Sequence, residues 1–191
     1  MRGLIYLGAL FTSLLAPISF SQAIEPLQQI PLPADYLSFL QSKNGDEGWL
    51  GEDYFILWRA DDLVSLNHKY EVEHYAPGIF LFGSTGSGDA WGFDLRANPP
   101  TVVRIPFVGM AAGHVETVAN SFSELLQLSA SHPTPSLKPA SEHAGMELFE
   151  IQPIIFGGDP VDPANKEWKS REEHIQLVRF WNQTLEKAKQ D

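Results

Sequence analysis

The sequence has 191 residues, 43% hydrophobic and 19% charged, which suits one well-buried domain of about 100 to 150 residues with extensions. Its 24 acidic residues outnumber 13 Lys and Arg, and the net charge of −11 argues against nucleic-acid phosphates as a partner and suits a basic protein surface better. The alternative is that the acidity serves solubility alone. Because no cysteine is present, disulfides, thiolate metal sites and cysteine nucleophiles are excluded.

A candidate export leader occupies residues 1–23. It carries one positive charge at Arg2, followed by an apolar run over residues 4–15 that is too short to span a bilayer, which needs about 20 residues. Pro17 ends any helix, and the small residues up to Ala23 predict cleavage after that position, leaving 24 acidic and 12 basic residues, or −12. This predicts an exported or periplasmic protein without a stable membrane span. The alternative is a cytoplasmic protein with a misassigned start or a buried amino-terminal helix.

The first elements after the leader are a helix, a strand and a second helix. A short amphipathic helix is predicted over residues 32–40, with Pro33 in its first turn and Asn44-Gly45 as a left-handed cap. A β-rich strand is predicted over 54–58 and a helix over 59–70. The apolar face of the first helix comprises Leu32, Tyr36, Phe39 and Leu40.

A β-hairpin is the clearest local pattern. Its strands are predicted over 79–82 and 90–94, joined by the glycine-rich turn 83–89. A further strand is expected over 101–105, and Pro106 should end its pairing because proline lacks an N–H donor.

A second amphipathic helix, predicted from about 116 to 129, should cover one face of this sheet. It closes the main domain, expected over 24–130. Residues 131–145, rich in proline and serine, are predicted to be a linker or a long surface loop. The apolar face of the helix comprises Val118, Phe122, Leu125 and Leu126.

A carboxyl-terminal extension over 146–191 is predicted to be a strand, a turn and a helix. The strand is expected over 148–156 and the turn over 157–160. Ser170-Arg171-Glu172-Glu173 forms a capping-box motif before the final helix. The apolar face of that helix comprises Ile175, Val178, Trp181 and Leu185.

Patterns that might carry chemistry favour structural roles. The glycines of 83–88 precede a strand and lack a following Lys-Ser or Lys-Thr, so they do not form a phosphate loop. Asp159, Asp162 and Asn165 suit turns better than calcium, and the six histidines show no zinc-binding spacing. A hydrolase using paired carboxylates such as Asp61-Asp62 would need burial to shift their pKa values. We therefore predict no catalytic residue, no metal site and no cofactor.

Residues 44–53 are the most suggestive segment outside the core. They hold four acids around one tryptophan in what we interpret as a flexible, glycine-bearing loop. Acids beside an aromatic anchor can dock a basic surface. The alternative is an ordinary solvated loop whose tryptophan folds onto the core. The candidate partner-binding residues are Asp46, Glu47, Trp49, Glu52 and Asp53.

Several of these segments, in this order, resemble the SUKH superfamily, which includes fungal Smi/Knr-type cell-wall regulators and bacterial toxin-immunity proteins. The resemblance implies an α+β fold with a twisted, mainly antiparallel sheet flanked by helices, to which this chain adds its carboxyl-terminal extension. It also implies no cofactor and function by protein binding. The matching segments are Leu32-Pro33 to Leu40, Asn44-Gly45, 78–83, 86–88 with Phe93-Asp94, Val102-Val103 and 122–126.

For bacterial members, the resemblance implies neutralisation of a cognate toxin, often a nuclease or deaminase. Our first hypothesis is therefore a non-enzymatic immunity-type protein that binds a basic toxin domain. The alternative is a regulatory or scaffold protein of envelope or cell-wall processes. The candidate leader bears on this choice, because members that bind intracellular toxins are expected in the cytoplasm.

Overall fold

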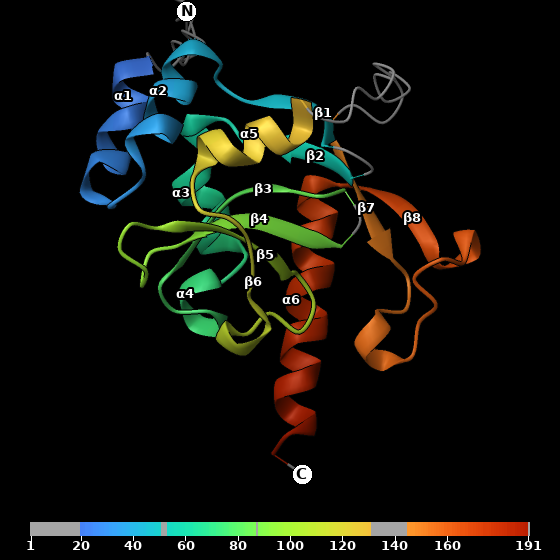
Figure 1. Cartoon of the computed structure of the whole chain (residues 1–191). Coiled ribbons are helices and arrows are strands. Elements are labelled where there is room, and N and C mark those ends of the chain that lie inside the picture. Colours follow the sequence, from blue (N-terminus) through green and yellow to red (C-terminus); the bar gives the residue numbers. More distant parts are fainter. Residues whose placement is uncertain (1–19, 51–52, 87, 131–144, 191) are drawn as a thin grey trace, which may run out of the picture.

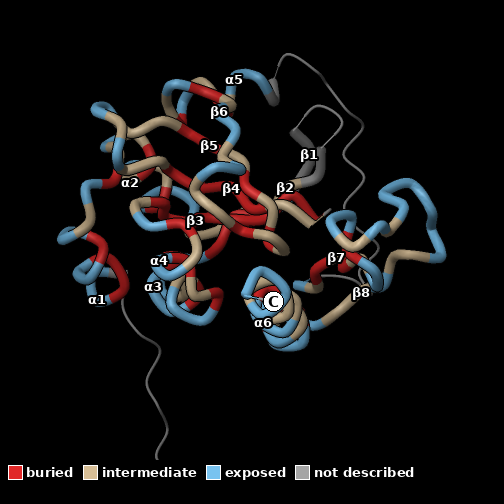
Figure 2. The backbone as a smooth tube through the Cα atoms, turned by 90° about the horizontal axis from the view of Figure 1, so that it is seen from below, coloured by how far each residue is buried: buried red, intermediate tan, exposed pale blue. Residues whose placement is uncertain are grey.

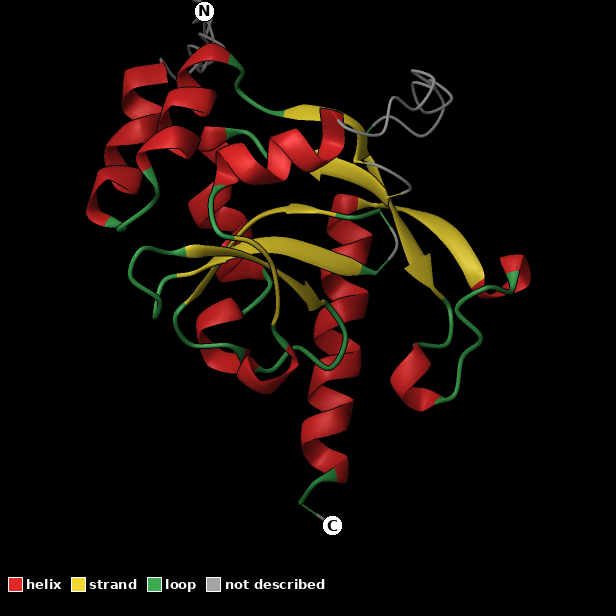
Figure 3. Ribbon diagram, in the orientation of Figure 1, coloured by secondary structure: helices red, strands yellow, loops and turns green. Residues whose placement is uncertain are grey.

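The computed structural model describes residues 20–50, 53–86, 88–130 and 145–190. It is an α+β fold in which a six-stranded sheet lies between helices, and a two-stranded sheet and a long final helix complete the molecule (Figures 1 and 3). The predicted fold class is confirmed. Most of the candidate leader and of the predicted linker lies outside the described residues.

Six strands form the main sheet in simple sequential order, and every neighbouring pair is antiparallel. This order needs only local connections, so the hairpin expected around the glycine-rich turn is present as β3 and β4. The strands are β1 (Asp46–Leu50), β2 (Asp53–Leu57), β3 (Ile79–Ser84), β4 (Asp89–Asp94), β5 (Thr101–Pro106) and β6 (Glu116–Ala119).

The described residues also form six α-helices. Figure 1 shows α5 and α6 on opposite faces of the main sheet, and Figure 2 shows the sheet between them with most of its residues buried. The helices are α1 (Phe20–Ile24), α2 (Ala34–Ser42), α3 (Ala60–Lys69), α4 (Val72–Tyr75), α5 (Phe122–Ala130) and α6 (Arg171–Ala188).

Aromatic side chains fill the core between α2, α5 and the sheet. The ring of Tyr36 on α2 lies 5.3 Å from Phe82, 5.1 Å from Phe93 and 4.9 Å from Phe122. Such tilted and edge-on arrangements add to the stabilisation that burial of large rings provides. The predicted face of the first helix therefore packs as expected. Ala23 and Ile24 of α1 are also buried in the core.

The predicted helix over 116–129 is wrong at its start, because Glu116–Ala119 is strand β6. This strand pairs with β5, and its β-branched Thr117 and Val118 suit a sheet edge. The helix begins only at Phe122, where the Glu124 backbone N–H donates to Ser121 Oγ at 3.1 Å. That bond caps the helix and fixes its first turn.

The extension also differs from its prediction. The strand expected over 148–156 is β7 (Met146–Glu150), and Pro153 precedes the short 3-10 helix η4 (Ile154–Phe156). Sequence reasoning missed β8 (Lys166–Ser170), which pairs with β7. The predicted capping box at Ser170 and Glu173 is confirmed at the start of α6. Two further 3-10 helices in the main domain are η1 (Glu25–Gln29) and η2 (Ala112–His114), and η5 (Pro163–Asn165) precedes β8.

Gly83 is required where β2 meets β3. A Cβ at this position would overlap the carbonyl oxygen of Ile56. The paired residues of the two strands are Ile56 with Ser84 and Leu57 with Gly83, and the Trp58 N–H donates to the Phe82 carbonyl beside them. The close backbone approach therefore depends on the missing side chain.

We expect Gly83→Ala to lower the free energy of unfolding by about 1–3 kcal/mol, the usual cost of overpacking. Urea unfolding would measure it. The control is Gly113→Ala, because a Cβ on Gly113 meets no atom within 4 Å. Equal effects of the two substitutions would contradict the assignment of Gly83 as a close-contact position.

Candidate protein-binding surface

The candidate binding segment is a β-hairpin, so its interpretation as a flexible loop is wrong. Asp46, Glu47 and Trp49 lie in β1, and Asp53 begins β2. Glu52 lies outside the described residues. Antiparallel pairing from Asp46 with Leu57 to Leu50 with Asp53 holds the backbone. Because β1 is the end strand of the sheet, the hairpin forms one of its edges.

The base of the hairpin is attached to the start of α3. Asn44 Oδ1 accepts a hydrogen bond from the Ala60 backbone N–H at 2.7 Å and so caps α3. The predicted left-handed cap of the first helix is wrong, because α2 ends at an extended Lys43. Gly45 does have a left-handed φ of +87°, but it turns the chain into β1. The hairpin and the first turn of α3 therefore lie next to each other.

Acidic residues concentrate in these two elements. Residues 46–62 contain six acidic residues and one basic residue, a net charge of −5. Residues 20–130 contain 14 acidic and 5 basic residues, or −9, whereas residues 145–190 contain 8 and 6, or −2. We call residues 46–62 the acidic hairpin surface; its acids are Asp46, Glu47, Glu52, Asp53, Asp61 and Asp62.

Exposed ion pairs lie at this surface among the residues that the structure describes. Lys43 Nζ lies 3.2 Å from Asp46 Oδ2, and Arg59 Nε lies 3.2 Å from Asp61 Oδ1. Both pairs are exposed, and such pairs contribute about 0–1 kcal/mol, so a partner can replace them at little cost. The side chain of Asp61 is 32% exposed, whereas a catalytic carboxyl pair needs a desolvated environment.

A buried glutamate joins the extension to the main sheet. Glu147 of β7 is 1% exposed; Ser84 Oγ donates to its Oε2 at 2.5 Å, and Arg171 Nε lies 3.3 Å from its Oε1. Burial raises the pKa of Glu147, while Ser84 and Arg171 lower it and the charge of Glu47 raises it further. Glu47 pairs with Ile56, and Ile56 pairs with Ser84, which places all three side chains on the same sheet face. The acidic hairpin surface therefore borders the attachment point of the extension.

A buried histidine forms a second junction. His174 of α6 is 1% exposed, and its Nδ1 lies 2.9 Å from the hydroxyl of Tyr70. Its ring meets Phe107 and Phe149 edge-on, at 4.9 and 5.5 Å. Burial, with a smaller contribution from Arg171, lowers the pKa of His174 to about 3. The imidazole is therefore neutral at physiological pH and part of the packed core.

Further polar contacts attach α6 along its length. Asn182 Nδ2 donates to the Phe107 carbonyl at 2.9 Å, and Asn182 Oδ1 accepts from the Gly109 N–H at 2.7 Å. Two exposed ion pairs, between Arg179 and Glu71 and between Lys69 and Glu172, lie at the rim. The extension is thus part of the folded unit.

Polar residues elsewhere serve turns. Asp159 Oδ1 accepts from the Val161 N–H, and Asp162 Oδ1 accepts from the Ala164 N–H, each at 2.9 Å. This confirms the predicted turn roles. Within the described ranges, no group of three His, Asp or Glu is arranged to hold a metal ion. No helix in the same ranges combines the length and apolar character needed to cross a membrane.

The family model of the SMI1 / KNR4 family (SUKH-1) matches residues 20–128, more than half of the sequence. The chain belongs to this family. The match runs from α1 into α5 and therefore includes the acidic hairpin surface, and we call residues 20–130 the SUKH domain. No curated protein matches the chain. The extension lies outside the match, although its side chains share the core of the SUKH domain.

We expect His174 to make stability depend on pH. An unfolded histidine binds a proton below its usual pKa of 6.5, whereas folded His174 stays neutral down to about 3. Its contribution is therefore present above pH 6.5 and is lost as the pH falls towards 3, by at most about 1.4 kcal/mol per pH unit. Urea unfolding should show that the free energy of unfolding of His174→Gln falls less between pH 7 and pH 4 than that of the natural chain. The exposed His68→Gln is the control, and parallel curves for His174→Gln and the natural chain would contradict the assignment.

Proposed function

We propose that this chain is a non-enzymatic protein-binding module of the immunity type, which binds and neutralises a cognate bacterial toxin. The observation that carries the proposal is the acidic hairpin surface at one edge of a SUKH domain. A net charge of −5 over residues 46–62 attracts a basic protein surface and steers its approach.

The backbone of this surface supports binding because it is ordered before a partner arrives. Pairing of β1 with β2 and the bond from Ala60 to Asn44 hold the backbone of Asp46, Glu47 and Asp53 on a fixed frame. A preorganised surface loses less conformational entropy on association than a flexible loop would. Charges on an edge strand also prevent unwanted strand pairing. Charge reversal separates the two roles, because lysines would still prevent strand pairing but would no longer attract a basic partner.

A regulatory or scaffold role in envelope or cell-wall processes is the second candidate. The apolar run over residues 4–15, followed by small residues up to Ala23, favours it, because this pattern is typical of an export leader. Under this proposal the chain is exported or periplasmic; under the immunity proposal it is cytoplasmic, unless its toxin acts in the periplasm.

A capture experiment tests both proposed functions. The full chain is expressed in its native host with a carboxyl-terminal tag. Mass spectrometry would identify the first residue and the proteins that co-purify. An uncleaved chain carrying one toxin domain supports immunity, and a chain that begins at Ile24 with envelope proteins attached supports the regulatory role. A chain that binds no protein at stoichiometric levels contradicts both proposals.

We expect Asp46→Lys combined with Glu47→Lys to slow association with the captured basic partner by about 10-fold at low salt, because steering depends on these charges. Association rates at two salt concentrations would measure it. The control, Glu25→Lys with Glu73→Lys, changes the net charge equally at exposed positions away from the hairpin. Equal slowing by both pairs would exclude the hairpin as the docking site.

A further inference from the structure

The extension exposes an unusual share of apolar side chains. Five of the seven large hydrophobic residues that are exposed in the described part of the chain lie between residues 145 and 190. Ile154 and Ile155 of η4 are 56% and 50% exposed. These two isoleucines are neighbours in the chain, and adjoining exposed apolar groups of this kind are characteristic of interaction sites. The five are Ile151, Ile154, Ile155, Val161 and Phe180.

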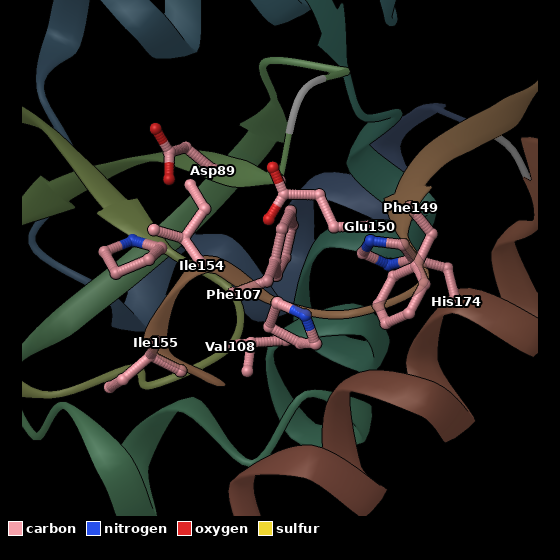
Figure 4. A pocket seen from close by; sticks show the side chains of 11 residues that line it. Asp89, Phe107, Val108, Phe149, Glu150, Ile154, Ile155 and His174 are labelled. Carbon is pink, nitrogen blue, oxygen red and sulfur yellow. The ribbon is translucent and has the colours of Figure 1, made fainter. Parts of the chain in front are cut away.

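A small pocket lies beside the two isoleucines of η4. It has a volume of about 70 Å³ and lies between the ends of β4 and β5 and the extension (Figure 4). A single water needs about 10–15 Å³, so the pocket can hold the end of one long side chain. Its apolar lining includes Phe107, Val108, Phe149, Ile154 and Ile155.

The charged lining of the pocket is acidic. Asp89 of β4 and Glu150 of β7 line it, and His174 at its edge is neutral near pH 7 because burial lowers its pKa to about 3. Arg104 Nε lies 3.8 Å from Asp89 Oδ2, and Lys166 Nζ lies 3.1 Å from Glu150 Oε1.

Among the described residues, the pocket lining itself carries two carboxylates and no lysine or arginine, because Arg104 and Lys166 contact Asp89 and Glu150 from outside the residues that line it. An apolar lining that holds two carboxylates matches the lysine or arginine side chain, which has an aliphatic stem and a cationic end.

We propose that this pocket receives a lysine or arginine side chain of the protein partner, and that the same partner covers Ile154 and Ile155. This inference rests on the proposed function and adds a second contact region, apart from the acidic hairpin surface. An apolar centre with a charged margin is the arrangement typical of interface hot spots.

The two sides of the pocket are joined through the core. Phe107 comes from the SUKH domain and Phe149 from the extension, and both pack against His174. The contacts of Asn182 with Phe107 and Gly109 hold the adjoining loop. A partner side chain would therefore enter a preformed site.

The test is an NMR titration of the ¹⁵N-labelled full chain with n-butylguanidinium, which stands in for arginine, and with n-butylurea, its uncharged isostere. We expect saturable shifts of the Asp89, Val108 and Ile155 amides with a Kd on the order of 1 mM for butylguanidinium, and at least about fivefold weaker binding of butylurea. Ile154→Ser and Glu150→Gln should each weaken butylguanidinium binding. Val161→Ser is the matched control, since Val161 is 82% exposed and does not line the pocket.

Absence of saturable shifts at these amides, or equal binding of the two probes, overturns the pocket proposal and leaves the hairpin-based function standing. Failure of the full chain to bind any protein in the capture experiment overturns the function itself. With the captured partner, Ile154→Asp should lower affinity at least about tenfold while Val161→Asp does not. Equal affinity of those two variants also counts against the pocket.

Discussion

The structure depends on the short pairing of β2 with β3. Ile56 pairs with Ser84 and Leu57 with Gly83, the Trp58 N–H donates to the Phe82 carbonyl at 2.9 Å, and the missing side chain of Gly83 permits the approach. On one side of this junction, the β1–β2 hairpin carries the acidic hairpin surface at the sheet edge. On the other, the hydroxyl of Ser84 binds Glu147 and so positions the extension. The acidic hairpin surface and the extension therefore both contact this junction, and a shift there would affect both.

Burial of polar side chains explains how the extension takes a single orientation. Apolar packing alone is tolerant of sliding, whereas a buried carboxylate or imidazole is costly unless its specific partner is in place. Glu147 needs Ser84 and Arg171, and His174 faces Tyr70. These contacts occur at both ends of the extension, in β7 and in α6. The pocket beside η4 exists because this docking brings Phe149 and Phe107 to the ring of His174.

Periodicity predicted most of the fold, because strands such as 79–82 and 90–94 have β-rich sequences bounded by glycine. It failed at Glu116–Ala119, where Val118 fits the helical repeat of the following residues, although Ser121 and Glu124 form a recognisable capping pattern. The acidic residues of 44–53 identified the candidate binding segment, but its three glycines suggested a loop. The pairing of β1 with β2 shows that it is a hairpin. The junction contacts were beyond prediction, since Ser84 and Glu147 lie 63 positions apart. One signal was available in the sequence: the polar residues His174 and Asn182 each lie four positions from Val178 and so share the buried face of α6.

The family match ends at residue 128, but the folded unit continues through α6. The boundary of the family match therefore differs from the boundary of the folded unit. A chain truncated at the end of the match would leave Phe107 and Tyr70 without the cover of His174, and Ser84 without Glu147. Newly bared aromatic surface of this kind promotes aggregation. For this protein, the smallest fragment that keeps these contacts extends through α6, beyond the boundary of the family match.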